Sequence, residues 1–354
     1  MKISTRATLE CSIDSAWEAL HTPDIFRRVS APFTVFRTTT DSPLPDRFDT
    51  GVDYQVTVMA GGIIPLGRQV IHLSDQITDW TKRTVTDSGH GVSGALGSLR
   101  GWNHRMSLQA RPDGRTDFFD TLNVQAGVQT PLLWPALRIM WAWRAMRLRQ
   151  VTKALDPAAT NMWNARYAGK SAMWSGKVNP VLEQVASTLT PGQAIDAGAG
   201  EGGDAVWLAG QGWSVTALEA SSVGIYRGVQ AAQSAGHEIV WKVSDLAQPW
   251  PVEAKSAQLV SLQFIHTDPD TRQAIWSHAV DAVAPGGTLL IVGHDPADAE
   301  AGIPRPPAVM CFGQDDVGLI PSEWSSVTAR RVPRKQTVDG REVDVHDVVI
   351  EAVR

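Results

Sequence analysis

The chain has 354 residues, of which 43% are hydrophobic and 19% are charged. This length and composition predict two domains with hydrophobic cores and exclude extensive disorder. A net charge of −5 and a pI near 6.0 argue against a nucleic acid as the main partner, because phosphate binding depends on clustered Lys and Arg.

Targeting and redox signals are weak in this sequence. The N-terminal residues lack the apolar core of a signal peptide, and no charge-free run approaches the roughly 20 residues of a membrane span. We therefore expect a cytoplasmic protein with no integral membrane segment. Cys11 and Cys311 are the only cysteines, and their spacing fits neither a metal site nor a redox motif.

The first half of the chain has the pattern of an antiparallel sheet. Apolar and polar residues alternate over 2–13, which predicts a half-buried strand. Ser15 and Glu18 have the spacing of a capping box and predict a helix start. Strand patterns separated by glycine-containing turns follow, and a helical pattern closes this half over 131–155. The predicted strands cover residues 33–39, 52–59, 69–77, 82–87, 102–110 and 116–124.

This order of elements, together with Trp17 and the strand that contains residues 102–106, resembles the SRPBCC or START-like helix-grip fold. The resemblance covers about residues 1–155. It implies an α+β domain in which an antiparallel sheet wraps around a long C-terminal helix and encloses an apolar or aromatic ligand. Candidate cavity residues lie on or beside the strands, although polar residues on such sheets more often face solvent. They are Arg68, His72, His104 and Arg105.

Residues 156–160 are short, polar and interrupted by proline, and we interpret them as a domain linker. Beyond them, helices are predicted over 161–169 and 179–189. Strands near residues 194, 215, 239, 259 and 289 then alternate with helices, which indicates a parallel α/β sheet. Two final strands, 326–332 and 343–353, meet at a turn around 339–340 and form an antiparallel pair.

The stretch 194–203 carries the main functional signal. An apolar strand reaches Asp196, and Gly198 and Gly200 follow in a bend that precedes a helix. With Gly203, these glycines also satisfy the G-x-G-x-x-G spacing of dinucleotide-binding loops, so the stretch fits either a dinucleotide or a cationic ligand without phosphates. Asp196 distinguishes these two ligands, because a carboxylate there would repel a pyrophosphate and favour a cationic ligand. The stretch therefore favours S-adenosylmethionine (SAM).

Asp196, Gly198, Gly200, Gly202 and Glu219 resemble the first two motifs of class I SAM-dependent methyltransferases. Residues 163–167 and 174–180 look like the leading segment of the tellurite- and thiopurine-methyltransferase-like branch. Further matching segments are 244–246, 258–264 and 284–291. The resemblance implies a Rossmann-like, seven-stranded methyltransferase domain over 161–354. One departure is Gln258, which stands where the fourth strand often begins with an acid, so no catalytic or metal role is assigned there.

The resemblance also implies roles for individual residues. Glu219 would accept hydrogen bonds from the ribose hydroxyls, Asp196 would face the cofactor's amino group, and Asp245 would hold the adenine amino group. Trp163 and Trp174 would offer aromatic rings near the sulfonium or simply pack in the core. The expected cofactor-binding residues are Trp163, Trp174, Asp196, Gly198, Gly200, Gly202, Glu219, Asp245, Leu246 and Gln263.

Two histidines follow predicted strands at the edge where a methyl acceptor should lie. His266 comes after the fourth strand and His294 after the fifth, and both are candidates to take a proton from a hydroxyl or thiol acceptor. A surface or capping histidine is the alternative for each. An acceptor that is already a thiolate would need no base.

The sequence thus predicts SAM-dependent methyl transfer to a small-molecule acceptor, with an apolar or aromatic ligand bound by the first domain. One alternative is a catalytically silent SAM-binding protein with a carrier or sensor domain. Another is a bifunctional cyclase and methyltransferase. The acceptor, a substrate shared by the two domains and the oligomeric state have no signal in these residues.

Overall fold

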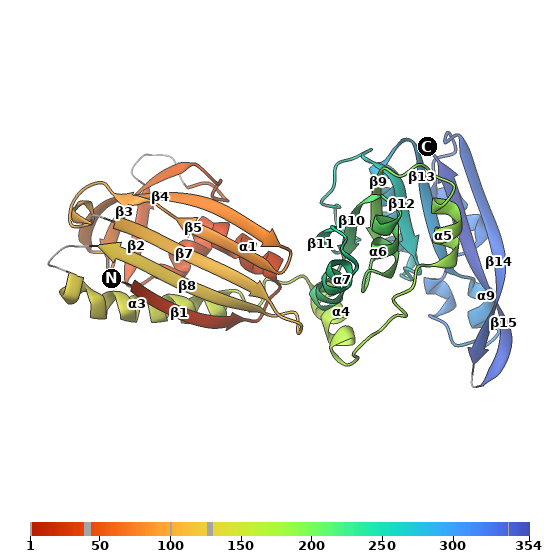
Figure 1. The fold of residues 1–354 in the computed structure, drawn as a ribbon, viewed down its shortest axis with the longest axis horizontal. Helices are drawn as coiled ribbons and strands as arrows, with labels where there is room; N and C mark the ends of the chain where they lie inside the picture. Colours follow the sequence, from red (N-terminus) through yellow and green to blue (C-terminus); the bar gives the residue numbers. More distant parts are fainter. Residues whose placement is uncertain (1, 39–43, 100, 126–129, 339) are drawn as a thin grey trace. The chain divides into compact units, whose positions relative to one another are not determined.

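The computed structural model describes residues 2–38, 44–99, 101–125, 130–338 and 340–354, with the backbone alone for 130–133. The chain divides into two compact units, Met1–Ala158 and Ala159–Arg354, each with its own sheet (Figure 1). Within the described ranges, no helix combines the length and apolarity needed to cross a bilayer.

The first unit is built on an antiparallel sheet with the strand order β1-β8-β7-β5-β4-β3-β2, and β6 pairs with β4. Its strands lie where alternation predicts them, although β4 is much longer than expected and β1 ends earlier. Their bounds are β1 Lys2–Leu9, β2 Thr34–Thr38, β3 Asp53–Ala60, β4 Ile64–Asp79, β5 Lys82–Asp87, β6 His90–Gly91, β7 Gly101–Ala110 and β8 Thr116–Gln125.

A different residue from the expected one caps the first helix, α1 (Ile13–His21). Ser12 Oγ accepts the backbone N–H of Ser15 at 3.2 Å, so Ser12 is the N-cap. Asp156 holds Ser12 in place, because its carboxylate accepts both the N–H and the hydroxyl of Ser12. The side chain of Glu18 instead accepts a hydrogen bond from Arg47. The expected Ser15–Glu18 capping box is therefore wrong.

Helices cover the sheet of the first unit. After α1, Pro23 begins α2 (Pro23–Ser30), and a short 3-10 helix, η1 (Leu96–Ser98), precedes β7. The long helix α3 (Thr130–Val151) closes the unit and packs against β1 (Figure 1). Trp141 of α3 is fully buried in a cluster with Ile3, Leu122 and Val124, which fastens the helix to the sheet.

The segment 156–160, which we expected to be a linker, is partly structured. Asp156 is bound to Ser12 in the first unit, and α4 (Ala158–Ala168) begins three residues earlier than the predicted helix at 161. Two alanines favour helix formation directly after Pro157, which is tolerated just before a helix. The next helix, α5 (Pro180–Ala186), starts as predicted at Asn179, whose Oδ1 accepts the N–H of Val181 at 2.9 Å.

The second unit contains a seven-stranded sheet with the order β11-β10-β9-β12-β13-β15-β14. The first five strands in this order are parallel, and β15 and β14 form the predicted antiparallel pair. Asp339, in the turn between them, lies outside the described residues. The bounds are β9 Gln193–Ala197, β10 Ser214–Glu219, β11 Val240–Val243, β12 Ala257–Gln263, β13 Val283–His294, β14 Ser326–Val338 and β15 Arg341–Val353.

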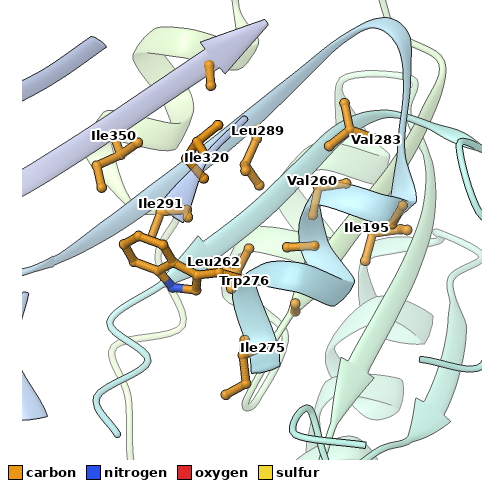
Figure 2. Close-up of a cluster of buried hydrophobic side chains, with 14 of the residues drawn as sticks. Ile195, Val260, Leu262, Ile275, Trp276, Val283, Leu289, Ile291, Ile320 and Ile350 are labelled. Atoms are coloured by element: carbon orange, nitrogen blue, oxygen red, sulfur yellow. The ribbon is translucent and has the colours of Figure 1, made fainter. Parts of the chain in front are cut away.

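Helices flank this sheet: α6 (Gly203–Gly210), α7 (Ser222–Ala235), α8 (Pro269–Ala282) and the short α9 (Pro296–Glu300), with the 3-10 turns η3 (Ala308–Met310) and η4 (Gln314–Leu319). Ile275 and Trp276 of α8 pack toward Leu262 and Ile291 in a buried apolar cluster (Figure 2). This core fixes the carboxyl ends of β9, β10 and β12, where the candidate site lies.

Candidate cofactor and acceptor site

A sharp bend connects β9 to α6. Gly198, Gly200 and Gly202 all have positive φ, at +78°, +57° and +84°. A Cβ on Gly198 would lie 2.2 Å from Cδ1 of Ile265, and one on Gly202 would lie 2.6 Å from the Trp241 ring. Glycine is therefore required by both backbone conformation and space, and the bend leaves backbone groups open to a ligand.

Glu219 lies at the end of β10 and supports this bend. It is buried, its Oε2 accepts the N–H of Gly200 at 2.9 Å, and its Oε1 accepts the N–H of Ser221 at 2.7 Å. Burial raises the pKa of the Glu219 carboxyl, and the backbone N–H groups oppose this rise only in part. Ala220 contributes a third backbone N–H, and the four lone pairs of the carboxylate exceed these three donors, so Glu219 is fixed in place and can still accept from a ligand.

Asp196, on β9, is only 2% exposed, and its Oδ2 has no hydrogen-bond partner among the described residues. Burial raises the Asp196 pKa well above its usual value, and the charges of Asp204 and Glu219 raise it further. Burial also raises the pKa of Asp204 to about 6. Three acidic groups therefore concentrate negative potential beside the glycine bend. A cationic ligand with an N–H donor would satisfy both the potential and the orphaned oxygen, so SAM fits this site.

A pair that the sequence did not indicate ties the leading segment to the bend. Arg227 Nη1 lies 2.6 Å from Glu201 Oε1, and the Glu201 carboxylate also accepts the N–H groups of Met173 and Trp174. Arg227 donates further to the carbonyl oxygens of Tyr167 and Lys170. Glu201 was visible as an acid between two of the glycines, whereas nothing in the sequence marked Arg227.

The two candidate aromatic residues differ in setting. Trp174 is 56% exposed, and its Nε1 donates to the Tyr167 hydroxyl at 3.0 Å, next to Gly200. Trp163 is half-buried and lies under the Arg166 guanidinium, with 4.6 Å from Cζ to the ring centroid. Trp174 is therefore beside the bend, while Trp163 has a structural partner of its own.

Asp245 and Leu246 follow β11. Asp245 is half-buried, and its Oδ1 accepts the N–H of Ala247 at 3.1 Å. Leu246 is buried, and its Cδ1 would lie 3.7 Å from a Cβ built on Gly198, so this loop reaches the glycine bend. At the end of β12, Gln263 Nε2 donates to Ser261 Oγ at 2.8 Å, while Oε1 is buried without a partner among the described residues.

The two candidate catalytic histidines lie together, with stacked rings 4.7 Å apart at 16°. His266 Nε2 accepts the backbone N–H of His294 at 3.1 Å, and the Phe264 carbonyl accepts from the His266 ring. Burial, followed by the charge of His294, lowers the His266 pKa to about 4. Both nitrogens of His266 are therefore occupied by partners within the protein.

His294 has a different environment. Its Nδ1 lies 3.0 Å from Asp347 Oδ1, and Asp347 Oδ2 accepts Arg334 Nε at 2.6 Å. Burial acts to raise the Asp347 pKa, but these two partners outweigh it and the pKa is lowered. An ionised carboxylate can only accept, so Nδ1 of His294 carries the proton and Nε2 is left as the basic nitrogen.

In the first unit, one of the four candidate cavity residues lines an internal cavity. His104 is buried there, while Arg68 and Arg105 are exposed and His72 pairs with Asp53 at 2.6 Å. The cavity is otherwise mainly apolar, and aromatic side chains from α2, the 44–52 segment and β8 surround it. These are Phe26, Phe48 and Phe118.

Comparison with known proteins agrees with the second unit's geometry. Residues 194–287 match the family model described as "Methyltransferase domain". This range contains Asp196, the glycine bend, Glu219 and Asp245. No curated protein matches the chain.

Solved structures similar to the chain include a SAM-dependent methyltransferase from Methanosarcina mazei, at 18% identity over 50% of this chain and 98% of that one, with a TM-score of 0.41. Others are the N-methyltransferase NodS from Bradyrhizobium japonicum with S-adenosyl-L-homocysteine (16%, 56% and 99%, TM-score 0.43) and TehB from Haemophilus influenzae (12%, 79% and 91%, TM-score 0.43). The family match gives the conclusion: the chain is an enzyme that contains a methyltransferase domain over residues 194–287 of its second unit.

Proposed function

We propose that this enzyme transfers the methyl group of SAM to a small-molecule acceptor at the carboxyl ends of β12 and β13, and that its first unit binds an apolar or aromatic ligand. One observation carries the cofactor part of this proposal. Asp196 Oδ2 is buried and unpartnered among the described residues, next to two further acidic groups. Leaving such an oxygen without a donor is costly unless a ligand satisfies it.

Each part of the site has a matching role in holding the cofactor. When bound, SAM supplies a methyl group activated by a positive sulfur. Asp196 accepts from the ammonium group, and Glu219 accepts from the ribose hydroxyls with the lone pairs that Gly200 and Ser221 leave free. Asp245 and Leu246 hold the adenine. The remaining proposed contacts come from Trp163, Trp174 and Gln263.

We assign the two histidines different tasks at the acceptor site. His294 takes the acceptor proton on Nε2, and Asp347 stabilises the resulting imidazolium through Nδ1. His266 is a positioning residue, because its Nε2 fixes the backbone of His294. The reaction still depends mainly on placing the acceptor in line with the transferred methyl group.

For the first unit, we propose the helix-grip fold expected from the sequence, with the internal cavity as its ligand site. The antiparallel sheet, the long helix α3 and the aromatic cavity lining support this assignment. The ligand is the acceptor itself or a molecule that accompanies it.

Calorimetry with SAM and its demethylated product tests the cofactor site. We expect Asp196→Asn and Glu219→Ala to weaken binding at least tenfold and Gly200→Val to abolish it. Glu238→Ala, an exposed acid in the same unit, is the matched control and should bind normally. Binding of a nicotinamide dinucleotide in place of SAM would overturn the assignment.

The acceptor is tested separately. Mass spectrometry of small molecules that co-purify with the full chain, followed by methylation assays with thiols, phenols and metalloid oxyanions, should give one methylated class. If SAM binds and no acceptor class reacts, the catalytic role fails while the cofactor site stands.

A further inference from the structure

The two units of the chain carry opposite net charges. Met1–Ala158 contains 18 Lys and Arg against 15 Asp and Glu, a net charge of +3, whereas Ala159–Arg354 contains 14 against 22, a net charge of −8. The positive charge is also unevenly placed, because residues 121–155 contain five Lys and Arg and no Asp or Glu. An anionic partner is therefore attracted to the first unit and repelled by the second.

Two groups of apolar side chains are exposed on the first unit. Around the turn between β3 and β4, Ile63 is 82% exposed and Ile64 is 63% exposed. On α3, Ile139 is 60% exposed and Met146 is 44% exposed. Ile139 lies four residues before Trp143 and Met146 lies three residues after it, so these three side chains share one face of the helix.

Phe33 connects the two groups. Its carbonyl oxygen accepts the N–H of Gly61, in the β3–β4 turn, at 3.0 Å. Its ring meets the Trp143 ring edge-on, with the centroids 5.8 Å apart, and Trp143 Nε1 donates to the Ala31 carbonyl at 2.7 Å. These exposed and half-buried residues therefore form one surface, which we call the apolar stripe: Phe33, Ile63, Ile64, Ile139, Trp143 and Met146.

Arginines lie along the apolar stripe. The Arg147 guanidinium is over the indole ring of the stripe, with 6.0 Å from Cζ to the centroid, and Arg37 Nη2 lies 3.5 Å from the Gly62 carbonyl in the β3–β4 turn. Arg27 is exposed, and its carbonyl accepts the N–H of Ala31. In the described part of the chain, no carboxylate forms an ion pair with Arg27, Arg37 or Arg147. Their charges are therefore available to an anionic partner.

The combination of aliphatic side chains and arginines distinguishes the possible partners. A second copy of the chain would bring the same arginines of both copies together, which is repulsive. A nucleic acid would pair with the arginines but would place its phosphates against Ile63, Ile64 and Ile139. The boundary of an anionic bilayer matches both components, because phosphates lie beside acyl chains there.

We propose that the first unit docks on the surface of an anionic lipid bilayer through the apolar stripe. Ile63 and Ile64 enter the boundary between headgroups and acyl chains, and the three arginines contact lipid phosphates. This binding is peripheral and needs no spanning helix. It is independent of the methyl-transfer proposal, since it uses none of the residues placed at the cofactor or acceptor site.

Co-sedimentation of the full chain with lipid vesicles tests the proposal. One set of vesicles contains phosphatidylcholine alone, and the other contains equal parts of phosphatidylcholine and phosphatidylglycerol. We expect affinity for the mixed vesicles to be about tenfold higher or more, and to fall as salt screens the arginines. Equal affinity for the two sets, or binding to neither, would overturn the proposal.

A double variant at the turn tests the apolar part. Ile63→Ser with Ile64→Ser should lower affinity for the mixed vesicles about tenfold, because less apolar surface leaves water. These exposed residues add little to the core, so Tm should be unchanged. Ile77→Ser is the matched control: Ile77 is 61% exposed and lies on the same strand, about 40 Å from Ile64. Wild-type binding by the double variant would contradict the proposal.

Single variants test the charged part. Arg27→Gln and Arg147→Gln should each lower affinity for the mixed vesicles several-fold and leave that for phosphatidylcholine unchanged. Arg105→Gln, at an exposed position of β7, removes the same charge away from the stripe and should bind normally. If all three variants lose affinity equally, net charge explains the binding and the stripe does not.

Two further measurements address the other partners. Fluorescence anisotropy with a DNA duplex and sedimentation velocity should show neither DNA binding nor self-association through the stripe. Duplex binding that depends on Arg27 and Arg147 but not on Ile63 and Ile64 would assign the surface to a nucleic acid. A dimer that dissociates in the Ile63→Ser, Ile64→Ser variant would assign it to a second copy. Either result would overturn lipid docking.

Discussion

Oε2 of Glu219 accepts the backbone N–H of Gly200 at 2.9 Å, and this bond joins the end of β10 to the glycine bend after β9. A residue expected to bind only ribose therefore also shapes the glycine bend that we propose as the cofactor site. Since Glu219 is buried, its backbone partners lie where water does not replace a lost acceptor.

Replacing Glu219 should affect folding and binding together. Glu219→Ala leaves the N–H groups of Gly200 and Ser221 without their acceptor and should lower the free energy of unfolding by about 2–4 kcal/mol. Glu219→Gln keeps one acceptor and should cost less. Urea denaturation measures stability, and calorimetry measures SAM affinity. If Glu219→Ala loses SAM binding at full stability, the loop-shaping role is wrong.

The Glu201–Arg227 pair should control the leading segment. Arg227→Met removes the donor to Glu201 and to the carbonyls of Tyr167 and Lys170, so residues 170–178 should become easier to cleave with trypsin. We expect SAM affinity to fall several-fold, with a coupling energy of about 1 kcal/mol between Glu201→Gln and Arg227→Met.

Gln230→Met, at an exposed position of α7, is the control for this pair and should resemble the wild type. Additive effects of the two substitutions in the double variant would show that the pair does not act as a unit.

Local patterns in the sequence predicted the parts of the second unit that local chemistry decides. Gly198, Gly200 and Gly202 have the positive φ values that their spacing suggested, and the seven-stranded sheet has its expected antiparallel pair. Such features depend on residues a few positions apart, so a sequence reveals them directly.

Contacts between distant residues were the part that the sequence did not reveal. Ser12 caps α1 because Asp156, 144 residues away, holds its side chain. This tertiary contact, and not the Ser15–Glu18 spacing, determines the N-cap. His294 similarly gains its carboxylate from Asp347, 53 residues along the chain. Pairing of this kind follows from strand order, which the pattern of single residues does not encode.

The acidic groups beside the bend should make stability depend on pH. Burial raises the Asp204 pKa from 3.8 to about 6, so between these values the folded state binds more protons than the unfolded state. The contribution of Asp204 to stability is therefore most favourable below pH 4 and is lost as the pH rises to about 6. The loss should amount to about 1–3 kcal/mol.

The difference in unfolding free energy between Asp204→Asn and the wild type, measured at several pH values, tests this dependence. The variant should gain stability relative to the wild type as the pH increases from 4 to 7, as measured by urea denaturation at each pH. Saturating SAM should reduce this gain, because its positive charge stabilises the ionised carboxylates. A stability difference that does not change with pH would mean that Asp204 titrates normally.

Substitution of the two histidines should lower kcat to different extents, and the titration of His266 provides a further test. With a hydroxyl or thiol acceptor, we expect His294→Gln to lower kcat by about 100-fold or more and Asp347→Asn to lower it by about tenfold or more, because proton removal depends on both. His266→Gln should lower kcat much less, since its role is to hold the His294 backbone. Proton NMR should show that the His266 ring stays neutral down to about pH 4, because burial and the charge of His294 lower its pKa.

Asp344→Asn, an exposed acid on the same strand as Asp347, is the matched control and should leave kcat unchanged. An acceptor that is already a thiolate provides a second control, because it has no proton to lose and should react equally with the wild type and His294→Gln. If His266→Gln proves as damaging as His294→Gln and removes the same limb of the pH–rate profile, His266 is the base. The hydrogen bond from the His294 backbone to His266 Nε2 would then have to break during the reaction.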